Sequence, residues 1–79
     1  MTLQEHKELL MKPVWNYKDV MLYCGCKKSK AFQIMAICKE KLGGKVLFNN
    51  HGITRDSCLT YMGTSIEHER YIVSQLENT

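Results

Sequence analysis

A glycine between two helix-forming segments is the feature that most constrains this fold. Residues 17–24 carry apolar side chains at i, i+3, i+4 and i+7, and helical spacing continues over residues 28–42. Asn16 is a favourable N-cap for the first helix. Gly25 ends that helix, because glycine adopts a left-handed backbone at little steric cost. Two helices joined by so short a turn must cross steeply, and the pattern therefore predicts a helix-turn-helix.

Shorter elements are predicted on both sides of this pair. Helical spacing over residues 2–11 predicts a first helix, which ends before Pro13 because proline cannot donate the helical hydrogen bond. After the helix pair we expect a β-hairpin, with a β-prone run at 45–48, a turn cluster at 49–52 and a return strand at 53–54.

Two further helices are predicted near the C-terminal end. Residues 56–62 form a short helix that ends at Gly63, and Thr64 with Glu67 fits a capping box for a last helix at 65–76. We therefore expect one domain, mostly α with a small β-hairpin, of the winged helix-turn-helix type. It comprises an N-terminal helix within 1–13, the helix-turn-helix and wing over 15–62, and a C-terminal helix within 64–79.

Positive charge is concentrated in the middle of the chain. The sequence has 11 Lys and Arg against 8 Asp and Glu. Between residues 27 and 45, Glu40 is the one acid, and the basic residues there are Lys27, Lys28, Lys30, Lys39, Lys41 and Lys45. Such a distribution suits a surface that faces nucleic acid. On charge alone, an ordinary solvated face fits equally well.

At these residues the sequence resembles a known family. The run Trp15-Asn16-Tyr17-Lys18-Asp19-Val20, followed by Tyr23-Cys24-Gly25-Cys26-Lys27-Lys28-Ser29-Lys30-Ala31, resembles the opening of small excisionase-like winged-helix proteins. Phages, plasmids and other mobile elements encode these proteins, which are related to the MerR-type DNA-binding domain. The resemblance covers about residues 15–62. This chain departs from the family in its longer second helix and in a wing that lacks the arginines that many members carry.

The resemblance implies sequence-specific binding of duplex DNA, either beside a recombinase or in transcriptional control. Major-groove contacts would then fall to Ser29, Lys30, Gln33 and Phe32, and phosphate contacts to Lys27, Lys28 and Lys41. The wing would contribute Lys45, Asn49, Asn50, His51 and Arg55. For Phe32 the alternative is packing in the core or against a partner.

The cysteines and histidines do not form a site in the sequence. Cys24 and Cys26 have one residue between them, whereas structural zinc sites usually pair cysteines two to four residues apart. We expect Cys24, Cys26, Cys38 and Cys58 to be free core thiols. The histidines are scattered, and Gly43-Gly44-Lys45 lacks the remainder of a P-loop. The expected protein is not an enzyme and uses no metal or cofactor.

Location and partners are also predicted. No apolar run is long enough to span a membrane, and four cysteines without a secretory segment indicate the cytoplasm. Expected partners are double-stranded DNA, a recombinase, and a second copy in a homodimer or in cooperative binding. The alternatives are a protein-interaction module, such as a phage-encoded inhibitor or adaptor, and a plasmid replication or partition factor. The first and last helices would provide either a partner surface or the closure of the core, through Leu3, Leu9, Leu10, Ile66, Tyr71 and Ile72.

Overall fold

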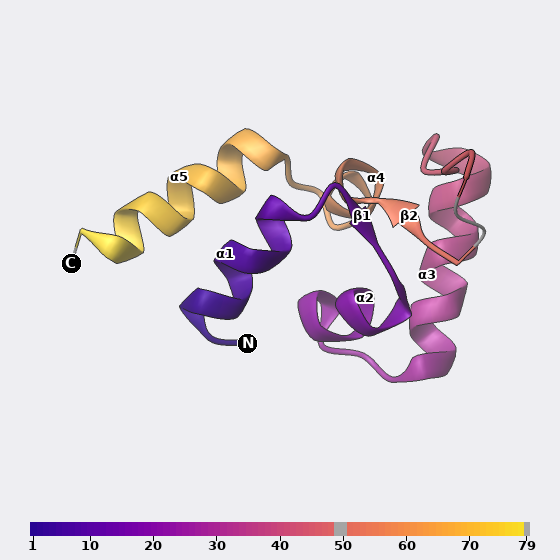
Figure 1. Ribbon diagram of the computed structural model, residues 1–79, viewed down its shortest axis with the longest axis horizontal. Helices are drawn as coiled ribbons and strands as arrows, with labels where there is room; N and C mark the ends of the chain where they lie inside the picture. The colour runs from indigo at the N-terminus through magenta and orange to yellow at the C-terminus, as the bar shows by residue number, and fades with distance from the viewer. Residues whose placement is uncertain (49–50, 79) are drawn as a thin grey trace.

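Five helices surround one short antiparallel sheet in the computed structural model, which describes residues 1–48 and 51–78. The molecule measures 38 × 22 × 22 Å, with α3 towards one end and the last helix extending towards the other (Figure 1). The elements are α1 (Leu3–Met11), β1 (Val14–Trp15), α2 (Tyr17–Cys24), α3 (Lys28–Lys41), β2 (Ile53–Thr54), α4 (Arg55–Tyr61) and α5 (Ile66–Glu77).

Side-chain caps fix the start of four of these helices. At α1, the Thr2 hydroxyl accepts from the Glu5 amide at 3.1 Å, and the Glu5 carboxylate accepts from the Thr2 amide at 2.9 Å. Asn16 caps α2 as predicted. The cap of α5 is Ser65, which accepts from the His68 amide at 3.2 Å, so the prediction of a Thr64 cap is wrong by one residue. The predicted helix type and approximate position hold for all five helices.

The core lies where α2, α3 and α4 meet the sheet. Its fully buried residues include Trp15, Val20 and Ile53. The indole N–H of Trp15 donates to the carbonyl of Leu9 at 2.9 Å, which satisfies a polar group that would otherwise be costly to bury. Trp15 therefore joins the end of α1 to the core.

The predicted β-hairpin is wrong in its pairing. Ile53–Thr54 is a strand as expected, but it pairs with Val14–Trp15 in the register Val14 to Thr54 and Trp15 to Ile53. The 45–48 segment contributes one isolated bridge, between Lys45 and Ile53. The reason is burial. The pairing with β1 places Trp15 and Ile53 in the core, whereas Leu47 and Phe48 are 83% and 99% exposed and gain nothing from a strand there.

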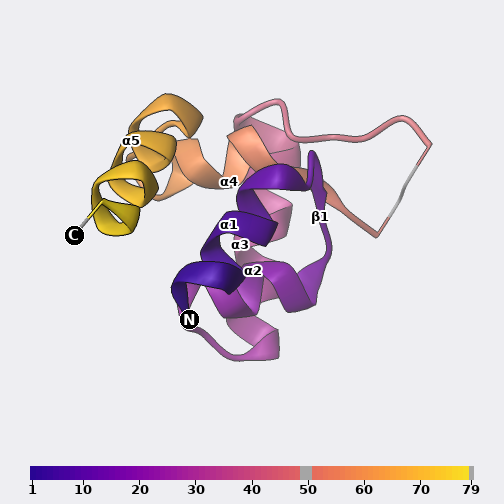
Figure 2. The same ribbon diagram turned by 60° about the vertical axis from the view of Figure 1, so that its left-hand side comes forward.

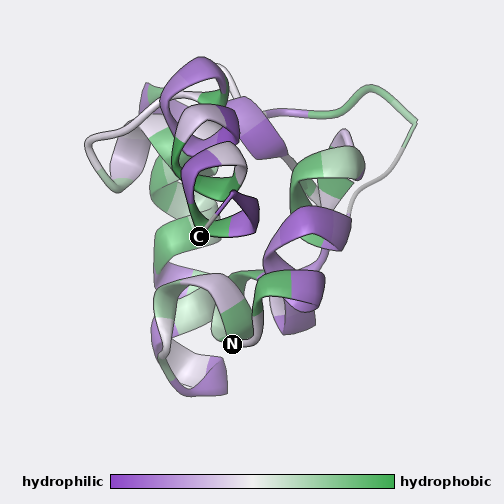
Figure 3. Cartoon of the chain, turned by 90° about the vertical axis from the view of Figure 1, so that its left-hand side faces the viewer, coloured by the Kyte–Doolittle hydropathy of each residue, from purple (hydrophilic) through white to green (hydrophobic). Residues whose placement is uncertain are grey.

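The loop after α3 projects away from the helices (Figure 2). Part of this loop is apolar (green in Figure 3), and the loop contains the exposed side chains of Leu47 and Phe48. Asn49 and Asn50, which the sequence places in the wing, lie outside the described residues.

The first and last helices pack on each other and close one side of the core. Leu9 and Leu10 of α1 and Val73 of α5 are buried there. Tyr71 and Leu3, predicted for the same surface, are exposed. Among the described residues, no helix has the length and apolarity that crossing a bilayer requires.

Candidate nucleic-acid interface

The two helices predicted around Gly25 are present and pack directly on each other. Gly25 is the C-cap of α2 with φ of 64°, a left-handed conformation that costs glycine little. Residues 25–27 are all that separate α2 from α3. Ala31 is fully buried, and its small side chain permits close packing of α3 on the core. Helix α3 ends at Lys41, one residue before the predicted end, and Leu42 is its C-cap.

Helix α3 buries one edge and exposes the other. The buried edge carries Ala31, Ile34, Met35 and Cys38. Because residues advance about 100° around an α-helix, Ser29 and Gln33 fall opposite that edge. Lys28 and Lys30 lie on either side of Ser29. All four of these residues are exposed.

The start of α3 has no side-chain cap. Its N-cap residue is Lys27, which makes no capping hydrogen bond, and its first turn contains no acid. Within residues 1–48 and 51–78, each of the other four helices has both a capping side chain and an acid in its first turn. The first amides of a helix lack intrahelical acceptors and carry a positive partial charge. Here Lys27, Lys28 and Lys30 add their charges to these amides, so the N-terminal start of α3 is strongly electropositive.

An aromatic stack supports one of these lysines. The rings of Tyr17 and Phe32 have centroids 5.2 Å apart with an interplanar angle of 25°. The Nζ atom of Lys28 lies 5.2 Å from the Tyr17 centroid and 6.0 Å from that of Phe32. Such cation–π contacts favour a defined position for the ammonium group. Phe32 is 48% exposed, so it lies outside the core, and one of its contacts is the stack on Tyr17.

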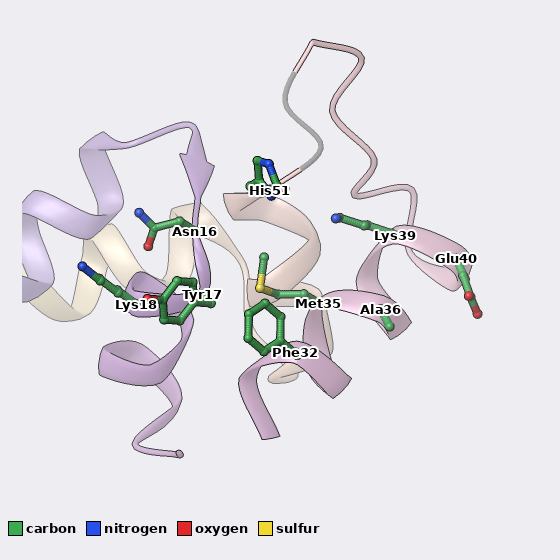
Figure 4. Close-up of a pocket in the computed structure, with 9 residues that line it drawn as sticks. All are labelled: Asn16, Tyr17, Lys18, Phe32, Met35, Ala36, Lys39, Glu40 and His51. Atoms are coloured by element: carbon green, nitrogen blue, oxygen red, sulfur yellow. The ribbon is translucent and has the colours of Figure 1, made fainter. Parts of the chain in front are cut away.

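A groove of about 690 Å³ opens beside this stack, between the start of α2, the exposed flank of α3 and the loop before β2 (Figure 4). Tyr17, Phe32 and Met35 contribute large apolar side chains to its lining. Basic groups border it, together with one acid. The remaining lining residues are Asn16, Lys18, Ala36, Lys39, Glu40 and His51.

The structure brings half of the predicted site residues together. Those at the start of α3 are Lys27, Lys28, Ser29, Lys30, Phe32 and Gln33. Lys41 is exposed at the opposite end of the helix, about 20 Å further along its axis. Lys45 is exposed in its isolated bridge, and His51 lines the groove.

Arg55 does not belong to a wing. It is the first residue of α4, and its backbone N–H donates to the carbonyl of Pro13 at 2.9 Å. Its guanidinium donates to the carbonyl of Leu10 at 2.6 Å, and the side chain is only 16% exposed. Arg55 therefore holds the α1–β1 connection against α4.

Sequence reasoning did not identify Tyr17 or Lys18 as site residues. Tyr17 matches the apolar stripe of α2 and was expected in the core, but it is half-buried and stacks on Phe32. Tyr17 and Phe32 lie on different helices, so no spacing within one helix pairs them. The available signal was an aromatic residue immediately after the N-cap Asn16, where side chains often stay partly exposed.

The four cysteines are free thiols that differ in burial. Cys38 and Cys58 are fully buried, as expected, whereas Cys24 and Cys26 are only partly buried. In the described part of the chain, no three acidic, histidine or cysteine side chains are grouped as a metal site would require.

Comparison with protein families, curated proteins and solved structures gives no match for this chain.

Proposed function

We propose that the protein binds duplex DNA as a helix-turn-helix protein, with α3 as the recognition helix. The observation that carries this proposal is the uncapped, acid-free start of α3, surrounded by Lys27, Lys28 and Lys30. A protein gains stability from a capping side chain, and this helix forgoes it. Unpaired amides and lysines at a helix start form a site for phosphate oxygens.

The exposed edge of α3 also has the composition that groove binding requires. Ser29 and Gln33 offer hydrogen-bonding groups to base edges from the centre of this edge. Lys28 and Lys30 lie on opposite sides of it, facing the two walls of the groove. A major groove is about 12 Å wide and has a phosphate backbone on each side. We assign Lys28 and Lys30 to phosphates on opposite strands, and base reading to Ser29 and Gln33.

Phe32 has a supporting role in this arrangement. Its ring stacks on Tyr17 and holds the Lys28 ammonium, so it positions a phosphate contact and does not itself reach a thymine methyl group. Lys18 and Lys39 border the adjoining groove and extend the basic track beside this contact.

Glu40 limits how much of α3 approaches DNA. It lies on the same outward edge as Gln33, two turns later. Its carboxylate would face the negative potential of the duplex there. The first two turns of α3 therefore enter the groove, and the end of the helix stays outside.

The biological role follows from the resemblance to excisionase-like proteins: assistance of site-specific recombination, or transcriptional regulation of a mobile element. A domain with one recognition helix reads few base pairs, so binding beside a recombinase or a second copy would extend the site. Self-association is supported by the exposed apolar side chains of the α1–α5 side, which include Met11, Tyr71 and Leu76.

The test begins by selecting bound sequences from a random duplex pool and measuring affinity for the selected site by fluorescence anisotropy at several salt concentrations. The double variant Lys28→Ala/Lys30→Ala should bind roughly 10- to 100-fold more weakly, with a smaller salt slope, because two phosphate contacts are lost. The control is Lys41→Ala/Lys45→Ala, which removes the same charge from the far end of α3 and the loop after it, outside the two turns that enter the groove, and should bind like the wild type.

Two results would contradict the proposal. One is a failure to enrich any duplex sequence, which would favour the protein-interaction alternative. The other is equal weakening by both double variants, which would show a general charge effect without a role for α3.

A further inference from the structure

Two free cysteine thiols, one on α2 and one on α4, lie in contact with each other. Cys24 is the last residue of α2, and Cys58 lies in the middle of α4. Their Sγ atoms are 4.0 Å apart, although the residues are 34 positions apart in the sequence. Cys24 is partly exposed, whereas Cys58 is fully buried.

We propose that Cys24 and Cys58 form an oxidisable dithiol site, which reacts with a hydroperoxide and closes to an intramolecular disulfide. The geometry supplies what this chemistry needs: one thiol that solvent reaches and a second thiol in direct contact that solvent does not reach. A disulfide requires the sulfurs to approach to about 2.05 Å. The two side chains must therefore close a further gap of about 2 Å, within the reach of side-chain rotation and small helix shifts.

Cys24 is the attacking thiol. Its sulfur lies within hydrogen-bonding distance of the Cys58 sulfur, and this contact lowers the pKa of Cys24 because a thiol beside it can stabilise the thiolate, while partial burial opposes the effect. The pKa of Cys58 is raised by the same contact, by burial and by its cysteine neighbours. A thiolate is the nucleophilic form of cysteine, so the difference assigns attack to Cys24 and resolution to Cys58.

The chemistry balances in two steps. The Cys24 thiolate attacks the terminal oxygen of the hydroperoxide, the O–O bond breaks, and Cys24 becomes a sulfenic acid. The leaving oxygen takes up the proton that the Cys24 thiol released, and departs as an alcohol, or as water from hydrogen peroxide. The Cys58 sulfur then attacks the sulfenic sulfur, the S–S bond forms, and the hydroxyl group leaves as water with the Cys58 proton. Two thiols are oxidised and one peroxide is reduced.

The other two cysteines are less suited to this reaction. Cys38 is fully buried, burial raises its pKa, and the hydroxyl of Ser57 lies in hydrogen-bonding contact with its sulfur. Cys26 lies beyond the Gly25 turn, and its pKa is raised by desolvation and by the nearby Cys24. Among the described residues, Cys24 and Cys58 are the two cysteines whose sulfurs lie in direct contact.

A disulfide here would enclose α3 in a covalent loop, because the whole helix lies between residues 24 and 58. Cross-linking restricts the unfolded chain and so stabilises the fold. The inference does not depend on DNA binding, and its test does not use DNA.

The first experiment treats the folded, reduced protein with hydrogen peroxide, blocks residual thiols, and maps disulfides by trypsin digestion and mass spectrometry. The intact chain should lose the mass of two hydrogen atoms and remain a monomer on a non-reducing gel. Cys24 and Cys26 share the tryptic peptide 19–27, while Cys58 lies in 56–70 and Cys38 in 31–39. The variant Cys26→Ser removes this ambiguity and should still give a 19–27 to 56–70 cross-link.

Any of three results would overturn the proposal: a cross-link to 31–39, an intermolecular dimer, or accumulation of sulfinic acid at Cys24 without a cross-link. The last would show that Cys58 cannot reach the sulfenic acid before it is oxidised further.

A second measurement uses stability. Oxidation of the wild-type protein should raise its Tm by roughly 10 °C, and dithiothreitol should reverse the rise. Cys24→Ser, a change at the partly exposed position, should fold but show no rise. An unchanged Tm for the oxidised wild type, or an equal rise in Cys24→Ser, would show that the pair does not cross-link.

Discussion

The first-turn backbone amides of α1 and of α3 have opposite surroundings. At α1, Thr2 and Glu5 exchange hydrogen bonds in a complete capping box, and the acid complements the helix dipole. At α3, a lysine occupies the capping position and two more follow in the first turn. The first arrangement stabilises the fold. The second leaves the positive groups of the helix start without a neighbouring acid.

Under the proposed function, this difference separates a helix end that contributes stability from one that contributes binding. A missing cap costs a helix about 1 kcal/mol, a considerable share of the stability of a domain of this size. Because α3 is buried along one edge by the core, packing maintains it without the cap. Residues 1–4, at the start of α1, are exposed, so this end of the helix depends more on its box.

The largest expected effect comes from giving α3 the cap of the other helices. Lys27→Asp supplies an acceptor for the first-turn amides and should raise the free energy of unfolding by about 1 kcal/mol. The same change should weaken DNA binding at least tenfold, by roughly the loss of one phosphate contact and the gain of a repulsive charge. Chemical denaturation and anisotropy on the selected duplex measure the two quantities.

The essential part of the Lys27→Asp prediction is that the free energy of unfolding rises while the DNA affinity falls. A matched substitution, Lys45→Asp, changes charge equally in the loop without adding a cap. If Lys27→Asp lost stability, or bound DNA as tightly as the wild type, the assignment of an anion site to the start of α3 would fail.

The intermediate effect comes from removing a cap that has no proposed function. Thr2→Ala should lower the free energy of unfolding by about 1 kcal/mol, because the Glu5 amide loses the Thr2 hydroxyl as its acceptor, while the backbone N–H of residue 2 still donates to Glu5. DNA affinity should stay unchanged. Thr2→Ser, which keeps the hydroxyl, is the control. A change in affinity for Thr2→Ala would mean that the two helix ends are not functionally separate.

The smallest effect is a pH dependence at α1. Hydrogen bonds from the Thr2 backbone and side chain lower the pKa of Glu5 below its ordinary value of 4.5. A carboxyl group with a lowered pKa contributes stability above its ordinary pKa, and the contribution disappears as pH falls through the lowered value. The stability difference between the wild type and Glu5→Gln should therefore shrink on acidification. A difference that is constant from neutral to acidic pH would show that the box does not depend on the Glu5 charge.

Local signals in the sequence were sufficient for the helices. The apolar spacing of α2 and α3, the Asn16 cap and the Gly25 turn are all short-range features, and the structure contains each of them. The β-hairpin failed because β-propensity in residues 45–48 says nothing about a competing partner. Val14–Trp15 is distant in sequence, and it wins the pairing because Trp15 becomes buried.

In the candidate site, too, the features that depend on local sequence could be predicted, and those that depend on tertiary packing could not. The lysines, Ser29 and Gln33 follow from their position after a turn and before a helix. The contribution of Tyr17 required knowledge of how α2 packs against α3, which periodicity does not provide. The cysteine contact between α2 and α4 was hidden for the same reason: each thiol matches a core position on its own helix, and only the tertiary fold brings the sulfurs together.

The pairing of β1 with β2 has a consequence for the order of folding. Because these strands meet across residues 16–52, the ladder closes a long loop, and this closure has an entropic cost that two short strands cannot offset alone. The α2–α3 pair has contacts that are close in sequence and forms without that cost. The β1–β2 ladder should therefore form late in folding, after α2 and α3 have packed on each other. Residues 46–48 lie inside the closed loop but outside the ladder, so changes in the length of this segment should slow folding only slightly.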